Sequence, residues 1–458
     1  MTKHLLLTFV LGISLLAARA SAEGPGSRHV LLITIDGFPA YLLDDPKAPI
    51  PTLRALAKRG ATAEGMRTVN PSVTWPNHTT LVTGVKPRRH SVIFNGILVR
   101  GESGQAVRVD PAHDQAELVA APTIFDLLHK AGFTTAAIDW PCTRNSKTLD
   151  VNFPDVPGQV QYMSKPLRDE LLASGALKDE TDKSFMAMSG PGRDQVWTEA
   201  ACRVIRENKP DFMLLHLLNG DAVHHTYGPQ TMAGYTANAL CDAQVRDVLA
   251  AIDQAGLTGS TTVIVTADHG FAVASKLMLP NVLFRQAGLL TPRPGGGYAH
   301  VRAQAISEGG SALIYLTDPA TANEDRQKVR ELLAGKEGIA AVIEPKDFDK
   351  IGIADPRLNP QAPDFVVMAK NSYAFDASSV GEDFIIPAVL GRHMVGNHGY
   401  DSDNAKMNAV FIAAGAGIVP HAHIGVFDNV DVAPTIARLF GIQMPNVDGK
   451  PLDDILAK

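Results

Sequence analysis

Three short apolar runs constrain this chain more than any other feature of its sequence. They are His29–Ile35 (HVLLITI), Phe212–Leu218 (FMLLHLL) and Thr261–Thr266 (TTVIVT). Each is rich in Val, Ile and Leu and lacks the polar alternation of a strand with one face in water, which indicates strands buried on both faces. Such strands form a mostly parallel central sheet flanked by helices, so we expect an α/β fold.

Strand-like and helix-like segments alternate along most of the chain. Further strand candidates are Thr134–Asp139, Ala312–Leu316, Asp364–Met368 and Ala409–Ala413, and helical patterns cover Thr52–Arg59, Ile124–Lys130 and Ala237–Ala255. Two regions, about 145–192 and 279–393, interrupt this alternation with prolines, glycines and charged residues. We therefore expect one domain over residues 23–458 with two insertions or caps on a single main sheet.

Residues 1–22 have the pattern of a secretory signal peptide. Lys3 and His4 provide a basic start, and the apolar run from Leu5 to Leu16 ends before the small residues Ala20 and Ala22. This run is shorter than the roughly 20 residues of a membrane-spanning helix. We expect the peptide to be cleaved, the mature form to have no membrane span, and the protein to be periplasmic or secreted.

Charge and cysteine content exclude two classes of protein. The 458 residues include 42 Lys and Arg against 48 Asp and Glu, with no basic run, so stable nucleic-acid binding is not expected. The cysteines Cys142, Cys202 and Cys241 are too few for a disulfide scaffold and lack metal-ligand spacing. Whether two of them pair, and the oligomeric state, stay open.

Carboxylates and imidazoles recur next to the predicted strands. In open α/β sheets, ligands bind outside the carboxyl ends of the strands. Each such residue alone is usually a cap or a hydrogen-bond partner, but independent capping does not explain a repeated Asp/His pattern at one edge. Imidazole suits zinc, carboxylate adds charge, and six ligands suffice for two metal ions. The six candidates are Asp36, Asp221, His225, Asp268, His269 and His398.

A hydroxyl nucleophile is expected in the segment Asn70–Thr80. Thr74 precedes a predicted helix, whose amino end favours phosphate through its free N–H groups and dipole. Ser72 is a competing nucleophile, and an N-cap role is the plainer reading of Thr74. Metal coordination is one way to activate such a hydroxyl.

With these residues in place, the chain resembles the nucleotide pyrophosphatase/phosphodiesterase (type I phosphodiesterase) family of the alkaline phosphatase superfamily. The resemblance covers nearly the whole mature chain. It rests on motifs in family order: Ile-Asp-Gly at 35–37, Thr-Trp-Pro-Asn-His at 74–78, Phe-Asn-Gly at 94–96, Trp-Pro at 140–141, Asp-x-x-x-His at 221–225, Ala-Asp-His-Gly at 267–270 and Asn-His-Gly-Tyr-Asp at 397–401.

The resemblance implies a role for each residue. Thr74 is the nucleophile that forms a covalent phosphothreonine, and Asn95 donates a hydrogen bond to a phosphoryl oxygen. One zinc ion is held by Asp221, His225 and His398. The other is held by Asp36, Asp268 and His269, with Thr74 completing its shell. His78 is expected to brace its loop, and His216 to be structural.

The expected activity is hydrolysis of phosphodiester or pyrophosphate bonds in a small-molecule phosphate ester or nucleotide. Trp140-Pro141 resembles the diesterase segment, with Cys142 in place of its glycine, whereas Arg144 and Lys147 are candidate clamps for a monoester. A phosphomonoesterase and a phosphonate hydrolase are therefore alternatives on the same core. A non-catalytic metal-binding protein is the alternative from another class. It predicts that the nucleophile or a metal ligand is missing, whereas the sequence keeps all of them.

Overall fold

The protein is described by a computed structural model that covers residues 24, 26–155 and 157–457. The predicted signal peptide at 1–22 lies outside these residues and stays a prediction. Along the part of the chain that is described, no helix combines the length and hydropathy needed to span a membrane. All three cysteines are buried and unpaired.

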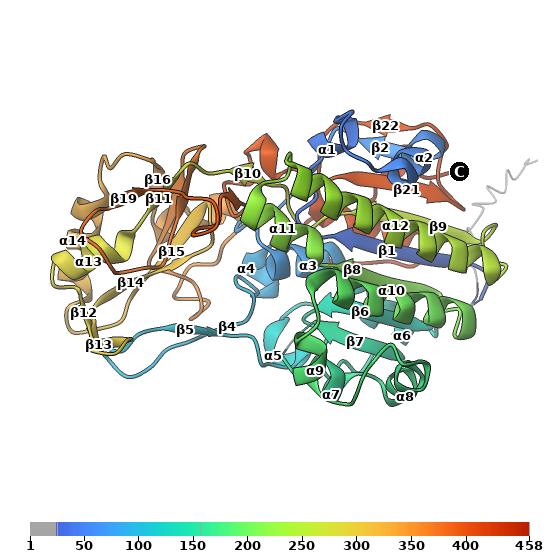
Figure 1. The fold of residues 1–458 in the computed structure, drawn as a ribbon, viewed down its shortest axis with the longest axis horizontal. Coiled ribbons are helices and arrows are strands. Elements are labelled where there is room, and N and C mark those ends of the chain that lie inside the picture. The colour runs from blue at the N-terminus through green and yellow to red at the C-terminus, as the bar shows by residue number, and fades with distance from the viewer. Residues whose placement is uncertain (1–23, 25, 156, 458) are drawn as a thin grey trace, which may run out of the picture.

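An eight-stranded sheet forms the centre of the larger part of the molecule, the main lobe (Figure 1). β9, β1, β8, β6 and β7 are parallel, whereas β21 is antiparallel to β9. This confirms the predicted mostly parallel sheet. The strand order is β22 (His423–Ile424), β2 (Ala61–Ala63), β21 (Phe411–Gly415), β9 (Thr261–Thr266), β1 (His29–Ile35), β8 (Phe212–Leu217), β6 (Thr135–Pro141) and β7 (Val151–Asp155).

Helices cover both faces of this sheet, as its two-sided apolar strands require. One face carries α2 (Pro51–Arg59), α10 (Gly190–Glu207) and α12 (Met232–Gln254), and the other carries α3 (Thr74–Thr83), α6 (Ile124–Lys130) and α15 (Val432–Leu439) (Figure 1). In α12, Val245, Val248 and Ile252 recur at helical spacing and are buried, so one stripe of this helix packs inward.

Residues 276–387 form a second, smaller body, the small lobe, on the left of Figure 1. Its antiparallel sheet has the order β14 (Ala303–Ser307), β15 (Ser311–Leu316), β17 (Phe365–Ala369) and β16 (Ile339–Ile343). A three-stranded sheet lies beside it: β18 (Tyr373–Phe375), β11 (Lys276–Met278) and β19 (Ile385–Pro387). The helices α13 (Pro280–Gln286) and α14 (Ala322–Leu333) complete the lobe.

β15 and β17 lie in the stretch 279–393 that was expected to be an insertion or cap, and they belong to a sheet separate from the main one. β15 and β17 are strands, as expected, but they pair with each other here and not in the main sheet. The reason is that their apolar residues pack into cores of the small lobe, with Ile314 and Val367 in one cluster and Leu313 and Val366 in another.

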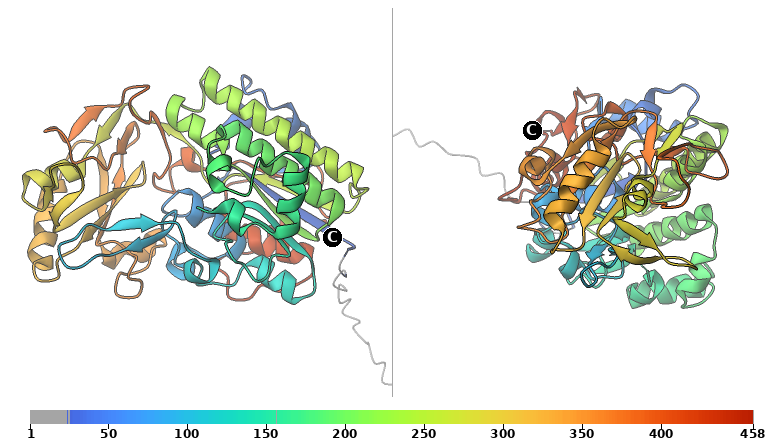
Figure 2. Two further views of the ribbon diagram at one scale, coloured as in Figure 1. Left: turned by 60° about the horizontal axis from the view of Figure 1, so that its bottom comes forward. Right: turned by 90° about the vertical axis from the view of Figure 1, so that its left-hand side faces the viewer.

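Two further segments attach to this frame. Residues 145–192 contain β7, the edge strand of the main sheet, followed by α7 (Gln159–Tyr162), α8 (Lys165–Ser174) and α9 (Asp182–Met186). The hairpin of β4 (Ile97–Val99) and β5 (Arg108–Asp110) runs from the main lobe along the small lobe (Figure 2). Its Leu98 packs with Leu313 and Tyr315, so the hairpin joins the two lobes.

Candidate active site

The six predicted metal ligands meet at the carboxyl edge of the main sheet, which faces the small lobe (Figure 1). Asp36 follows β1, and Asp268 with His269 follows β9. Asp221 and His225 lie on α11 (Asn219–Tyr227), which follows β8, and their four-residue spacing puts them on one helix face. His398 precedes β21, and because β21 is antiparallel, its amino end reaches the same edge.

Asp36, Asp268 and His269 form a compact buried group. His269 Nε2 lies 3.2 Å from Asp268 Oδ2 and 3.4 Å from Asp36 Oδ1. A tetrahedral zinc ion with ligands at about 2.0–2.2 Å separates those ligands by roughly 3.3 Å. All three atoms are buried and have no hydrogen-bond partner. The group therefore fits a metal ion.

Asp221, His225 and His398 form a second group next to the first. Asp221 Oδ1 lies 3.5 Å from His225 Nε2 and 3.7 Å from His398 Nε2, and it too is buried without a partner. His269 joins the two groups: its donor atom lies within 4.8 Å of those of Asp221 and His398, and its ring stacks on that of His398 at 3.8 Å. The six residues thus form one continuous site with two sets of donors.

The three candidate histidine ligands, His225, His269 and His398, use the same ring nitrogen to contact the backbone. In each, Nδ1 contacts a backbone carbonyl oxygen, which leaves Nε2 for a metal and is a common way to fix the tautomer of a ligating histidine. The pairs are His225 with Gly396 at 2.9 Å, His398 with Ser72 at 3.1 Å and His269 with Gly270 at 3.2 Å.

The buried carboxylates of the site repel one another, so a bound cation would stabilise them. Burial, together with Asp268 and Asp221, raises the pKa of Asp36 well above its usual value, and burial raises the pKa of Asp221 to about 6. Burial also lowers the pKa values of His269 and His398, so these rings are neutral and keep a lone pair. Neutral imidazoles beside crowded carboxylates match a divalent transition metal such as zinc.

Of the two candidate nucleophiles, only Thr74 has a free hydroxyl. Thr74 is the first residue of α3, and within the described residues its Oγ1 makes no hydrogen bond. Ser72 is fully buried, and its Oγ donates a hydrogen bond to the Tyr400 carbonyl oxygen at 2.6 Å. Of the two candidates, Thr74 is therefore the one whose hydroxyl is available at the amino end of α3.

Asn95 lies beside the nucleophile. The Trp75 N–H donates to Asn95 Oδ1 at 3.0 Å, which leaves the amide nitrogen of this exposed side chain as a donor next to Thr74. The following Gly96 has φ +145°, and a Cβ there would lie 2.5 Å from the Asp110 carbonyl oxygen. The turn that presents Asn95 thus requires glycine at position 96.

Two further histidines support the site from within the main lobe. His78 Nδ1 contacts the Thr74 carbonyl oxygen at 2.9 Å, so His78 braces the nucleophile's helix turn, in line with its expected role. His216 was expected to be structural, but its Nε2 lies 3.3 Å from Asp36 Oδ2. Thr34 Oγ1 contacts both rings, at 2.9 Å and 3.0 Å. The signal for His216 is its polarity within the otherwise apolar run FMLLHLL.

The residues expected to distinguish diester from monoester substrates, Cys142 and Arg144, lie near Trp75. Cys142 has φ +57°, so the backbone keeps a conformation that favours glycine. Arg144 pairs with Asp114, and its guanidinium lies 4.7 Å from the ring centre of Tyr162. Tyr162 packs on a cluster that contains Trp75 and Cys142. Arg144 is therefore held by a carboxylate and a ring.

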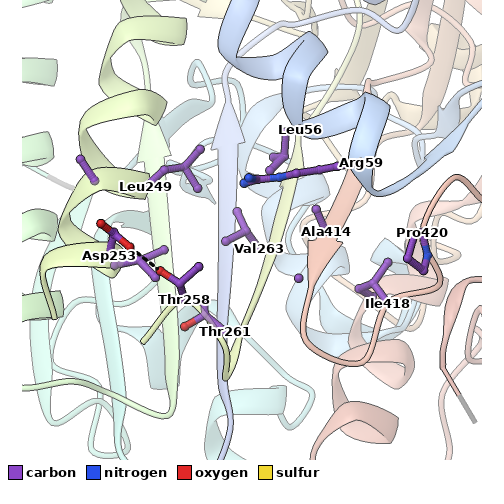
Figure 3. Close-up of a pocket in the computed structure, with 13 residues that line it drawn as sticks. Leu56, Arg59, Leu249, Asp253, Thr258, Thr261, Val263, Ala414, Ile418 and Pro420 are labelled. Atoms are coloured by element: carbon purple, nitrogen blue, oxygen red, sulfur yellow. Dashed lines mark hydrogen bonds between the residues drawn. The ribbon is translucent and has the colours of Figure 1, made fainter. Parts of the chain in front are cut away.

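A separate hollow of about 610 Å³ lies at the opposite edge of the sheet (Figure 3). Apolar side chains such as Leu56 and Val263 line it, together with Arg59 and with Asp253, which accepts a hydrogen bond from Thr258. In the described part of the chain, the groups of donors arranged for a metal ion lie at the carboxyl edge and not in this hollow. The chemistry therefore belongs to the carboxyl edge.

The sheet order, the paired donor groups and Thr74 define an alkaline phosphatase-like fold with a candidate metal centre. The sequence model described as "Type I phosphodiesterase / nucleotide pyrophosphatase" matches residues 30–401. The chain therefore belongs to the type I phosphodiesterase/nucleotide pyrophosphatase family, which confirms the resemblance stated above.

Individual relatives are distant in sequence and similar in fold. Bos taurus ectonucleotide pyrophosphatase/phosphodiesterase family member 3 is 24% identical over 92% of this chain and 43% of its own length. Homo sapiens family member 5 is 23% identical over 96% of this chain and 80% of its own length. The solved human member 5 has a TM-score of 0.70 at 18% identity, covering 94% of this chain and all of that one. Murine member 5, inactive and in complex with AMP, has a TM-score of 0.69. The chain spans less than half the length of the bovine relative.

Proposed function

We propose that this protein hydrolyses phosphodiester or pyrophosphate bonds of nucleotide-type substrates at a two-zinc site, through a phosphothreonine on Thr74. The observation that carries the proposal is the free hydroxyl of Thr74 at the same sheet edge as two groups of candidate metal donors, whose atoms Asp36 Oδ1, Asp268 Oδ2, His269 Nε2 and Asp221 Oδ1 are buried without a partner. Asp36, Asp268 and His269 would hold one ion, and Asp221, His225 and His398 would hold the other. Two such ions would supply Lewis-acid charge that favours an in-line displacement at phosphorus.

The protein's own residues perform the rest of the reaction. Thr74 Oγ1 loses its proton and forms a bond to phosphorus as the bond to the leaving oxygen breaks and that oxygen takes up a proton. The Asn95 amide donates a hydrogen bond to a phosphoryl oxygen where negative charge develops. A water then attacks phosphorus from the vacated side and loses a proton, the bond between phosphorus and Thr74 Oγ1 breaks, and Oγ1 takes up a proton to restore the hydroxyl. Two in-line inversions give net retention at phosphorus.

One observation supports a diester over a monoester, and a second supports a nucleotide-type substrate. A monoester carries an additional charged oxygen that an arginine or lysine clamp binds well. Arg144, which together with Lys147 was a candidate for such a clamp, is paired with Asp114, and its guanidinium lies over the Tyr162 ring. The murine relative in complex with AMP supports a nucleotide-type substrate.

A substrate panel tests the assignment. We expect about two zinc ions per chain and faster hydrolysis of bis(p-nitrophenyl) phosphate than of p-nitrophenyl phosphate. A strong preference for the monoester or for a phosphonate overturns the diesterase assignment. Bound metal without turnover of any of these substrates favours a non-catalytic metal-binding protein.

Removal of the nucleophile tests the covalent route. Thr74→Ala is expected to lower kcat by at least about 1,000-fold while zinc content is kept, because the attacking atom is lost. Thr236→Ala, on the exposed side of α12, is the control and should keep wild-type kcat. Near-wild-type turnover of Thr74→Ala with zinc bound contradicts the phosphothreonine route.

A further inference from the structure

The turn between β14 and β15 of the small lobe presses directly on the segment that carries His398. A Cβ on Gly309 would lie 2.6 Å from the His398 carbonyl oxygen. A Cβ on Gly310 would lie 2.3 Å from the Tyr400 ring, and one on Gly399 only 1.6 Å from the Glu308 carbonyl oxygen. The two backbones therefore interlock at a distance that only glycine permits.

Hydrogen bonds hold this contact from both sides. The Gly310 N–H donates to the His398 carbonyl oxygen at 2.7 Å. On the other side, the Ser72 carbonyl oxygen contacts His398 Nδ1 at 3.1 Å and accepts from the Gly399 N–H at 3.0 Å. The loop that carries His398 is thus held between the nucleophile segment of the main lobe and the turn of the small lobe.

The turn itself is rigidly supported within the small lobe. The Gly310 carbonyl oxygen accepts from the Ala369 N–H at 2.8 Å, and the Gly309 carbonyl oxygen accepts from the Phe375 N–H. The Ser307 Oγ donates to the Phe375 carbonyl oxygen at 2.8 Å and accepts from the Gly309 N–H at 3.3 Å. β17 and β18 therefore fix the turn, and the turn fixes the loop.

We propose that the turn Ser307–Ser311 is a positioning element for the metal held by Asp221, His225 and His398. It acts through the backbone of His398 and makes the small lobe a structural part of the metal centre. The inference rests on the proposed two-zinc function. Metal sites require their ligands to be held within about 0.5 Å, so a displaced His398 weakens the site that it enters more than the other site, which it contacts only through the ring of His269.

Two alanine substitutions, at glycines with the same positive φ, test whether the turn positions His398. Gly309 and Gly288 both have φ +74° and both lie in the small lobe, but nothing lies within 4 Å of a Cβ on Gly288. Gly309→Ala is expected to keep one tightly bound zinc, to raise the Kd for the second 10- to 100-fold, and to lower kcat at limiting zinc in proportion. Excess zinc should restore kcat. Gly288→Ala should bind both ions as the wild type does, whatever its Tm.

The readouts are zinc titration against a chelating dye, Tm and kcat on the full chain. The inference is overturned if Gly309→Ala binds two zinc ions with wild-type Kd, or if Gly288→Ala loses the second ion equally. Should Gly309→Ala not fold, Ser307→Ala decides, because it removes two hydrogen bonds of the turn without a clash. A three- to tenfold rise in the second Kd supports the inference, and an unchanged Kd overturns it.

Failure of the proposed function gives a different pattern. Wild-type protein that binds two zinc ions but turns over no phosphate ester overturns the proposed function, while the comparison of zinc Kd values still decides the inference. Wild-type protein that binds fewer than two zinc ions overturns both.

Discussion

Three polar side chains divide the work around the nucleophile. Thr74 presents a free hydroxyl, Asn95 presents an amide N–H, and Ser72 uses its hydroxyl and carbonyl to hold the loop of His398 and Tyr400. In the proposed reaction Thr74 would attack, Asn95 would stabilise charge and Ser72 would position the loop, and the hydrogen bonds of the three side chains distinguish these roles.

Substitution of Asn95 separates charge stabilisation from support of the helix start. Asn95→Ala is expected to lower kcat about 100- to 1,000-fold with zinc content unchanged, because a preorganised donor to the developing charge is lost. Asn95→Asp keeps the acceptor for the Trp75 N–H but replaces the donor with a charge, so its loss should be at least as large. Steady-state kinetics check both. Asn371→Ala, an exposed asparagine of the small lobe, is the control, and a change within twofold for Asn95→Ala contradicts the role.

Sequence reasoning identified the six candidate ligands and Thr74 because each follows or precedes a recognisable strand or helix. It did not identify the proximity of His216 to Asp36, because that contact depends on the register in which β8 pairs with β1. In the structure Thr34 pairs with His216, and the His216 ring thereby reaches Asp36. A lone histidine in an apolar strand signals that a partner exists but not which one.

At the scale of elements, α11 is positioned by a buried carboxylate at its amino end. Asp194 on α10 accepts hydrogen bonds from the Leu218 N–H at 3.1 Å and from the Asn219 N–H at 3.1 and 3.3 Å. These are amides at a helix start, where negative charge is favourable. Because α11 carries Asp221 and His225, Asp194 sets the place from which both side chains reach the edge of the sheet.

Burial raises the pKa of Asp194 from 3.8 to about 7, which gives stability a defined pH dependence. Between about pH 4 and 7 the folded state holds a proton that the unfolded state has lost, so this group's contribution to the free energy of unfolding falls as pH rises through that window. The total fall is up to about 4 kcal/mol. Asp194→Asn should lack this fall. Urea unfolding of both proteins from pH 5 to 8 checks it, and parallel curves for the two contradict it.

The arrangement of elements was only partly predictable. The parallel strands of the main sheet follow from their two-sided apolar runs. A cap was expected over 279–393, but the pairing of β15 with β17 in a separate sheet was not, because both have the same apolar character as β1 and β9 and differ only in the partners that chain connectivity allows. For the same reason, β7 falls within a stretch expected to be an insertion, although it pairs with β6 at the edge of the main sheet.

At the scale of the whole molecule, the acidic balance of the sequence is compatible with a phosphate substrate. Acidic residues exceed basic ones by six, yet three of the acids are candidate metal ligands. Bound metal ions are the largest local charges in such a site, so the field at Thr74 is set by them and not by the net charge of the chain. The acidic cluster and the metal ions are therefore one electrostatic unit, and removing the ions should affect the stability of the whole molecule.

Metal removal is expected to destabilise the protein, and more so at high pH. Without metal, burial raises the pKa of Asp221 to about 6 and raises that of Asp36 as well, so protons neutralise the cluster at low pH. As pH rises from about 4 through 6, those protons leave, and the free energy of unfolding of the metal-free chain falls by about 3 kcal/mol from Asp221 alone. A bound divalent metal ion would take the place of these protons and remove this dependence.

The measurement is the Tm of the zinc-loaded and the chelator-treated protein at pH 5, 6, 7 and 8. The gap between them should widen with pH. Asp221→Asn is the matched variant: it removes one buried charge, so its metal-free form should lose less stability between pH 5 and 8 than the metal-free wild type. A gap that is constant or narrows with pH contradicts the prediction, because it means that protons and metal ions do not compensate the same carboxylates.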